Sequence, residues 1–263
     1  MFEERELGEE LAGVRERHAP GALVLETPQF ESLPPEQAEG LGLLVERIEP
    51  AEHDEQWLPA DAPEQLRRYV ESEFSVGLPG DGGVAWTAQT VPPCVFRKAR
   101  LEGSPESFQE FLLAEALVQA GTGLPETFPG FFRERYRELA AVGLGPADTY
   151  QLAAALYEAY LGLHTRPVFA EWAEPFPGLY DAWVDAGERL VGRLEGLAGE
   201  VATGSTSFAA AAELACSAVK HDVDVPTPFS ALDTAAYRES GPEYAVAWAR
   251  KTVERMDDPN AGT

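Results

Sequence analysis

Proline spacing limits the helices that the first hundred residues can form. Ten of the 21 prolines in this 263-residue chain occur before residue 104. A helix interior excludes proline because the residue has no backbone N–H and its ring clashes with the preceding turn. The pattern therefore predicts only short helices in this region, at residues 2–17, 34–48 and 62–74.

Two short runs of strand-forming residues follow a glycine-rich turn at residues 77–83. Residues 84–91 read VAWTAQTV and residues 94–101 read CVFRKARL, with Pro92 and Pro93 between them. Runs of this composition on either side of a turn are typical of a β-hairpin. We expect a small hairpin here and no other β-structure in the chain.

From Ser104 onward the apolar residues recur at helical spacing. Ser104 and Pro105 suit the start of a helix that ends at Gly121. Further helices are predicted at residues 129–142, 147–163, 177–199, 206–220 and 240–256. The chain is therefore expected to be mainly α, with a proline-rich region of short helices at 1–103 and an antiparallel helical bundle at 104–263. The two regions either form separate domains or pack as one.

The sequence Phe-Pro-Gly occurs twice, beginning at Phe128 and at Phe176. Proline is tolerated in the first turn of a helix and holds the preceding residue in an extended conformation. Each copy is therefore predicted to begin a helix and to bury its phenylalanine ring beneath that start. Exposed rings would instead indicate a binding surface.

The charge pattern resembles that of cytoplasmic proteins from salt-in halophilic archaea. The chain carries 45 acidic residues against 20 Lys and Arg, a formal charge of −25, and has only three lysines. The acid is spread evenly, with −12 before residue 104 and −13 after it. In molar salt the Debye length falls to about 3 Å, so this self-repulsion is screened. The resemblance implies a salt-dependent cytoplasmic protein.

The acidic charge also disfavours some classes of binding partner. An evenly acidic surface repels nucleic acid, and no run of eighteen apolar residues predicts a membrane span. The one basic cluster, Arg97, Lys98 and Arg100, suits an anionic ligand or partner patch, although a strand edge guarded by charge or paired with nearby acids is favoured. Cys94 and Cys216 lie too far apart for metal-binding spacing and are expected to be free thiols.

Four histidines are present, and two of them precede an aspartate. His164, His221, Asp222 and Asp257 occur in the order found in metal-dependent phosphohydrolases, where one His, a His-Asp pair and a distant Asp hold the metal. A simpler interpretation is favoured, because His18, His164 and His221 each lie in a predicted last helical turn. A histidine there complements the helix dipole.

Two glutamates interrupt apolar predicted helices, and one predicted helix carries a stripe of aromatic residues. Neither feature belongs to a recognised motif. Glu115 and Glu158 are each expected at the solvated edge of an apolar helix. Tyr150, Tyr157 and Tyr160 recur at helical spacing with His164, and such a stripe usually packs in the core.

The residues therefore favour a non-enzymatic scaffold or protein-interaction module. Apolar stripes are frequent, while no set of catalytic side chains has the spacing of a known motif. The expected partner is another protein, and no cofactor is expected. A metal-dependent hydrolase is the alternative, carried by the histidine and aspartate order given above.

The charge arithmetic generates a first prediction. We expect the melting temperature of the protein to rise between 0.1 M and 2 M KCl, because screening relieves repulsion among 45 acidic side chains. Thermal unfolding followed by circular dichroism measures this, with a globular protein of near-zero net charge as the control. Sulfate salts are avoided because they strengthen apolar burial in any protein. An unchanged melting temperature contradicts the halophilic interpretation.

Overall fold

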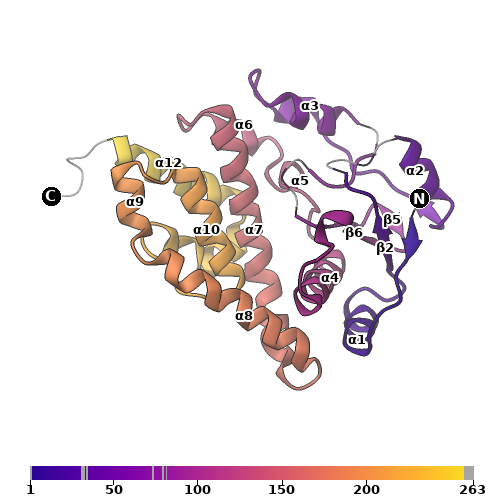
Figure 1. The fold of residues 1–263 in the computed structure, drawn as a ribbon. Helices are drawn as coiled ribbons and strands as arrows, with labels where there is room; N and C mark the ends of the chain where they lie inside the picture. Colours follow the sequence, from indigo (N-terminus) through magenta and orange to yellow (C-terminus); the bar gives the residue numbers. More distant parts are fainter. Residues whose placement is uncertain are drawn as a thin grey trace. The chain divides into compact units, whose positions relative to one another are not determined.

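The computed structural model describes residues 2–30, 33, 35–72, 74–78, 80 and 82–257 (Figure 1). The chain forms two compact units, each assembled from segments that are far apart in the sequence. The first contains residues 1–54, 64–130 and 171–182, and the second contains residues 55–63, 131–170 and 183–263. Helices predominate, which confirms the mainly α class. An antiparallel bundle at residues 104–256 stays a prediction.

The first unit contains a small mixed sheet. Its strands lie in the order β1 (Glu3–Glu4), β2 (Leu23–Thr27), β6 (Cys94–Lys98) and β4 (Val84–Thr87). Strand β6 pairs antiparallel with β4, from Thr87 opposite Cys94 to Val84 opposite Arg97, and parallel with β2. A separate antiparallel pair joins β3 (Arg47–Ile48) to β5 (Thr90–Val91).

The predicted pairing of the two strand runs is confirmed, but the expectation of no other β-structure is wrong. Strand β2 is a five-residue run, LVLET, between a helix and Pro28. So short an apolar run has no periodicity that separates a strand from a helix turn. The parallel pairing with β6 joins residues about seventy positions apart, which no local pattern encodes.

Within the described residues, four α-helices lie wholly in the first unit. They are α1 (Glu9–His18), α2 (Pro35–Gly42), α3 (Glu64–Glu71) and α4 (Glu106–Ala120). Helix α4 packs against α1, β4 and β6, so the expected boundary between residues 103 and 104 does not separate the two units. The first three helices are short, as predicted, but shorter than the predicted ranges 2–17, 34–48 and 62–74. Helices α2 and α3 end at Gly42 and Glu71, where no proline follows directly.

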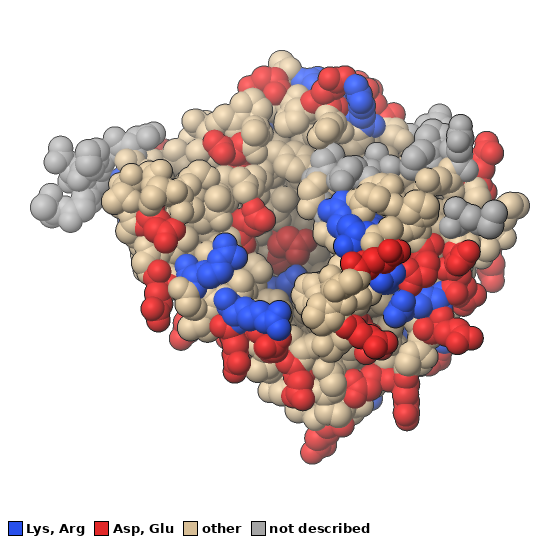
Figure 2. Space-filling model, in the orientation of Figure 1, with Lys and Arg blue, Asp and Glu red and all other residues tan. Residues whose placement is uncertain are grey.

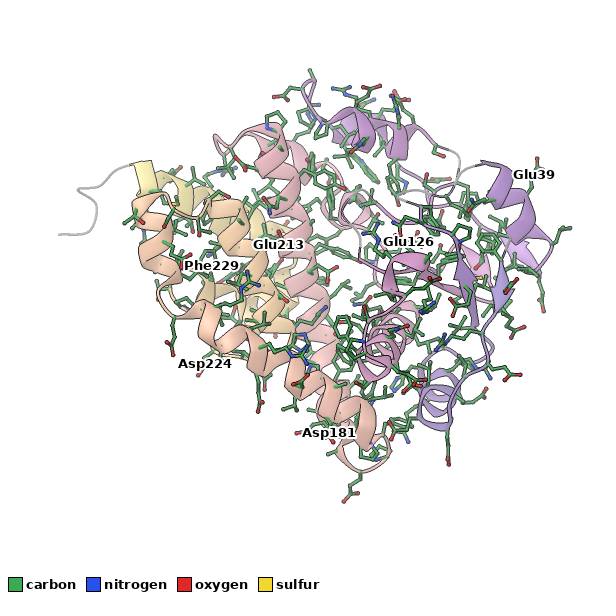
Figure 3. The ribbon with its side chains drawn as sticks, in the orientation of Figure 1. Glu39, Glu126, Asp181, Glu213, Asp224 and Phe229 are labelled. Carbon is green, nitrogen blue, oxygen red and sulfur yellow. The ribbon has the colours of Figure 1, made fainter. Side chains whose placement is uncertain are left out.

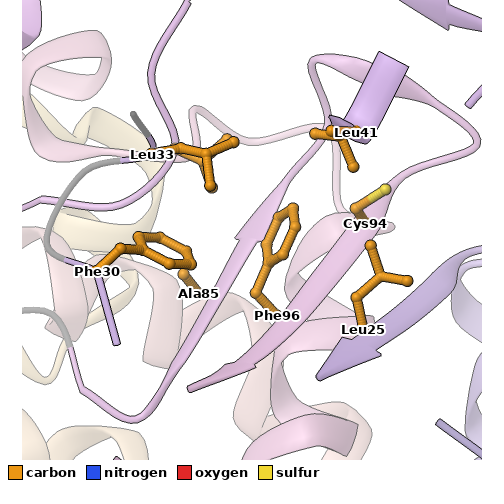
Figure 4. Packing of buried hydrophobic residues seen from close by; sticks show 8 residues of the cluster. Leu25, Phe30, Leu33, Leu41, Ala85, Cys94 and Phe96 are labelled. Atoms are coloured by element: carbon orange, nitrogen blue, oxygen red, sulfur yellow. The ribbon is translucent and has the colours of Figure 1, made fainter. Parts of the chain in front are cut away.

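Strand alternation gives the sheet two different faces. On one face, side chains from β2, β4 and β6 pack with residues of the loops and of α2. This cluster contains Leu25, Phe30, Leu33, Leu41, Val76, Ala85, Cys94 and Phe96 (Figure 4). On the other face Arg97 donates a hydrogen bond to Gln109 of α4, at 2.7 Å. The sheet therefore has an apolar cluster on one side and α4 on the other.

The described part of the second unit contains helices and loops but no strand. Its elements are α6 (Arg135–Ala140), α7 (Pro146–Ala170), α9 (Leu197–Thr203), α10 (Phe208–Lys220), α11 (Ala235–Ser240) and α12 (Pro242–Asp257). Helices α7 and α10 lie side by side (Figure 1). Two helices, α5 (Phe128–Phe132) and α8 (Pro177–Leu194), contribute residues to both units.

Two predicted helices are interrupted, and one is longer than expected. The helix predicted at 129–142 divides into α5 and α6 because Arg133 adopts a left-handed conformation with φ of 50°. The helix predicted at 177–199 ends at Leu194. Gly196 follows with φ of 84° and is the N-cap of α9. Helix α7 continues through Pro167 to Ala170, although the prediction ended it at residue 163.

Both Phe-Pro-Gly segments begin helices, as predicted. Phe128 is 2% exposed at the start of α5, and Phe176 is 7% exposed immediately before α8. The Phe176 ring contacts Trp172 edge-on and lies beneath the guanidinium of Arg17, 5.1 Å from the ring centroid. The expectation that these rings are structural is confirmed.

The start of α8 is also capped from outside its own helix. Glu10 of α1 accepts hydrogen bonds from the backbone N–H groups of Gly178, at 3.1 Å, and Leu179, at 3.0 Å. The first N–H groups of a helix have no partner within it and favour a negative charge. One carboxylate therefore satisfies two such groups and fixes residues 171–182 to α1 in the first unit.

The ends of α1 and α4 approach so closely that only glycine fits between them. A Cβ placed on Gly121, which follows α4, would lie 1.8 Å from the carbonyl oxygen of His18. No Cβ tolerates that distance, and the obstacle is backbone, so the two helix ends would have to separate.

None of the helices in the described ranges has the length and apolarity that a bilayer crossing requires.

We predict opposite effects for two Gly→Ala substitutions. Gly121→Ala forces α1 away from α4 and lowers the melting temperature by several degrees, or prevents folding of the first unit. Gly192→Ala in α8 is the matched control, because nothing lies within 4 Å of its Cβ. Alanine in a helix interior gains roughly 0.5–1 kcal/mol over glycine, so this variant is stable or slightly stabilised. Thermal unfolding of both variants tests the difference, and equal melting temperatures contradict it.

Candidate functional site

The His221–Asp222 pair lies immediately after α10 and contributes to the end of that helix. His221 caps the helix, and Asp222 takes a left-handed conformation with φ of 56°. The Nδ1 atom of His221 lies 3.0 Å from the carbonyl oxygen of Trp183, and the two rings stack. The indole N–H of Trp183 donates in turn to the carbonyl of Lys220, at 3.3 Å.

Arg166 of α7 is the central cation of this region. It donates a hydrogen bond to the carbonyl of Val219, at 3.0 Å, in the last turn of α10. It also pairs with Asp233, at 2.6 Å, and with Asp222, at 3.4 Å. A cation at the carbonyl end of a helix is favourable, and one guanidinium here joins α7, α10 and the following loop. Asp222 therefore contacts an arginine that also anchors a helix end.

His164 lies six residues before the end of α7, so the prediction that it lies in a last helical turn is wrong. Its ring contacts Tyr160 edge-on, with 4.7 Å between centroids. Burial lowers the pKa of His164 below its ordinary value, the Arg238 guanidinium lowers it further, and the backbone of Arg238 opposes both. The imidazole is therefore mostly neutral near pH 7.

The aromatic stripe of α7 packs as core only in part, because Tyr157 is buried whereas Tyr150, Tyr160 and His164 are half-buried. Tyr157 is 5% exposed and contacts Phe131, which also packs on Tyr160. Tyr237 of α11 is fully buried, contacts the ring of Tyr160, and donates its hydroxyl to the carbonyl of Leu156, at 2.7 Å.

The predicted last-turn positions of His18 in α1 and of His221 at the end of α10 agree with the structure.

In the described part of the chain, no group of three or more His, Cys, Asp or Glu side chains is arranged to hold a metal ion. His221 and Asp222 make the contacts given above, and His164 packs against Tyr160. The side chain of Asp257 lies outside the described residues. Nothing in the described geometry brings His164, His221 and Asp222 together as a metal centre.

The basic residues 97, 98 and 100 do not form one exposed patch. Arg97 pairs with Glu26 of β2 at 2.6 Å, and Glu26 also pairs with Arg5. Lys98 is fully buried, with its ammonium 4.7 Å from the centroid of the Phe30 ring. Consecutive residues of a strand point to opposite faces, which separates these two cations. Arg100 donates to Gln29 at 2.9 Å.

Sequence reasoning missed a polar cluster around Glu126 in the first unit (Figure 3). The carboxylate of Glu126 accepts hydrogen bonds from the Thr87 hydroxyl, at 2.8 Å, the backbone N–H of Ala88, at 3.1 Å, and the Gln89 amide. Gln89 also donates to the Ser75 carbonyl and accepts from Ala51 N–H. These bonds join four segments, and each partner is remote in sequence, so no local motif marks them.

The remaining candidate side chains are mostly buried. Glu115 is 5% exposed, so its expected place on a solvated edge is wrong, whereas Glu158 is exposed as expected. Both cysteines are buried free thiols, and burial raises the pKa of Cys94 to about 11. A thiol with so high a pKa is protonated and weakly nucleophilic at neutral pH.

An apolar surface feature occurs at residues 40–46, here called the Leu43–Leu44 turn. Four large apolar side chains are exposed in the described part of the chain: Leu43, Leu44, Val191 and Met256. The adjacent pair stands out, because Leu43 is 88% exposed and Leu44 is 46% exposed. The residue pattern predicts both leucines inside a helix at 34–48, but α2 ends at Gly42 and the leucines follow it.

Backbone bonds and buried neighbours hold this turn in place. Leu43 N–H donates to the Gly40 carbonyl, at 3.3 Å, and Leu44 N–H donates to the Leu41 carbonyl, at 2.9 Å. Leu41 is fully buried in the apolar cluster of the sheet (Figure 4). On the far side Glu46 N–H donates to the Val91 carbonyl, at 2.7 Å. The two leucines are therefore presented to solvent by a fixed backbone.

These observations define a mainly helical protein with a small mixed sheet and an exposed apolar turn. The chain belongs to the family of unknown function DUF7089, whose model matches residues 1–256. A search of curated proteins and a search of solved structures each returned no match.

The Arg166 contacts generate a stability prediction. Arg166→Met leaves the Val219 carbonyl and Asp233 without their shared donor, and we expect a loss of roughly 1–3 kcal/mol in the free energy of unfolding. Arg189→Met is the matched control, because Arg189 forms an exposed pair with Asp185 one turn away on α8. Such pairs contribute about 0.3–0.5 kcal/mol. Urea unfolding measures both variants, and equal losses contradict a structural role for Arg166.

Proposed function

We propose that this protein is a non-enzymatic interaction module of a salt-rich cytoplasm and that it binds another protein through the Leu43–Leu44 turn. The observation that carries the proposal is the exposure of two adjacent leucines on a hydrogen-bonded turn. Exposed leucines that occur singly are ordinary, but an adjacent pair held outward offers apolar area that a partner can cover.

The use of the polar side chains supports binding over catalysis. Arg166 bonds to a helix end and two aspartates, and Glu126 bonds to three donors on a neighbouring loop. Glu10 caps α8. These charged groups stabilise the fold, and each is occupied by contacts that a catalytic role would have to break.

The charge distribution supports the salt-rich setting of the proposal. Asp and Glu side chains appear across the face shown in Figure 2, on elements of both units. With a formal charge of −25, the surface carries far more acid than its basic residues can pair with. Such a surface suits a solvent in which ions screen repulsion over a few ångströms.

Site-specific photocrosslinking in a salt-grown host cell tests the proposed function. A benzophenone amino acid replaces Leu43 in one variant and Val191 in another, which is an exposed apolar control on α8 at 47% exposure. We expect a defined crosslinked protein from position 43 and none from position 191. That protein, purified, is then expected to bind the wild-type chain and to lose affinity at least tenfold for Leu43→Ser/Leu44→Ser. No adduct at position 43, or equal adducts at both positions, refutes the proposal.

A further inference from the structure

The surroundings of the Leu43–Leu44 turn restrict the chemistry of whatever covers it. Close to the two leucines along the chain, the exposed acids in the described residues are Glu39 on α2 (Figure 3), Glu46, Glu49 and Glu52. The only Lys or Arg among residues 36–66 is Arg47, which pairs with Glu49 at 2.8 Å. Two exposed leucines therefore stand among acids that outnumber the local base.

We infer that the partner segment is a basic amphipathic helix, whose apolar stripe covers Leu43 and Leu44 and whose flanking arginines or lysines pair with Glu39 and Glu46. This inference rests on the proposed function and specifies the partner of the same surface. Burial of the leucines supplies the non-directional attraction, and the acids supply the selection by charge.

The fixed backbone of the turn favours binding without rearrangement. Leu41 lies buried on one side of the pair, and on the other side Glu46 N–H bonds to the Val91 carbonyl. A preorganised surface loses little conformational entropy when it is covered. Two adjacent projecting side chains match the stripe of an amphipathic helix, in which apolar residues recur every three or four positions.

Short-range ion pairs are compatible with a salt-rich solvent. Salt at molar strength screens charges beyond about 3 Å, but an arginine fork in direct contact with a carboxylate lies within that range. We therefore expect ion pairs in direct contact to select a basic partner, and we expect little long-range electrostatic attraction between the partner and this chain. High salt strengthens the relative contribution of the apolar stripe.

The same features disfavour other occupants of the turn. Nucleic acid and anionic lipid would place phosphates beside Glu39 and Glu46. A second copy of the chain would bring an identical set of acids to the contact. Two leucines also cover much less than the roughly 800 Å² that each partner buries in a stable interface, so other residues of a larger partner have to contribute.

A designed peptide tests the inference. The probe is an 18-residue helical peptide with leucine on one face and arginine beside it, titrated into the full chain by fluorescence anisotropy in 0.5 M KCl. We expect saturable binding that falls at least tenfold for Leu43→Ser/Leu44→Ser and severalfold for Glu39→Gln/Glu46→Gln. Glu239→Gln/Glu254→Gln is the charge-matched control, because both acids are exposed on α11 and α12, and it binds as the wild type does. Unchanged melting temperatures show that each variant is folded.

Each other outcome overturns the inference. Peptide binding that survives Leu43→Ser/Leu44→Ser, or that falls equally with Glu239→Gln/Glu254→Gln, shows non-specific attraction to an acidic chain. Binding of a peptide with glutamate in place of arginine shows that charge does not select the partner. Sedimentation as a dimer that depends on Leu43, or flotation with vesicles of phosphatidylglycerol, assigns the turn to a second copy or to a membrane. If the peptide fails but position 43 still crosslinks to one protein, the proposed function stands and the partner chemistry is wrong.

Discussion

The alternation of side chains along β6 organises the first unit. Cys94 and Phe96 face the apolar cluster, and Lys98 lies against Phe30 on that side. Arg97 bonds on the other face to Gln109 of α4 and to Glu26 of β2. One five-residue strand thus fixes β2, β4, α4 and the loop carrying Phe30 in a single arrangement. A shift of one residue would exchange its apolar and polar contacts, so the register has no near alternative.

The sequence predicts where most helices lie, because helix formation depends on neighbours within one or two turns. The predicted cap at Ser104 is wrong, because Pro105 precedes α4 and no side chain caps that helix. Helices α1, α2 and α3 are short in the proline-rich region, and both Phe-Pro-Gly segments bury their rings. Strand β2 was missed because its pairing with β6 is a long-range contact. Breaks at Arg133 and Gly196 were also missed, since a left-handed residue inside a helical pattern leaves the apolar spacing almost unchanged.

The candidate site was predicted less well than the fold, because its contacts join residues that are far apart in the sequence. His221 was placed correctly at a helix end, but Arg166, which bonds to that end from another helix, has no signal in its own surroundings. Leu43 and Leu44 were assigned to a helix that the structure ends at Gly42. The predicted helix continued six residues too far, to residue 48, so the sequence did not show that the leucines lie on an exposed turn.

The cap that Glu10 provides for α8 affects how the protein is made. Residues 171–182 belong to the first unit, while residues 131–170 belong to the second. At roughly 5–20 residues per second, synthesis from residue 130 to residue 182 takes several seconds. During that interval α1 lacks its contacts with residues 171–182. In the folded chain Gly13 and Arg17 contact the ring of Phe176. The nascent first unit is therefore completed only after α7 has been synthesised, which ties the order of folding to the order of translation.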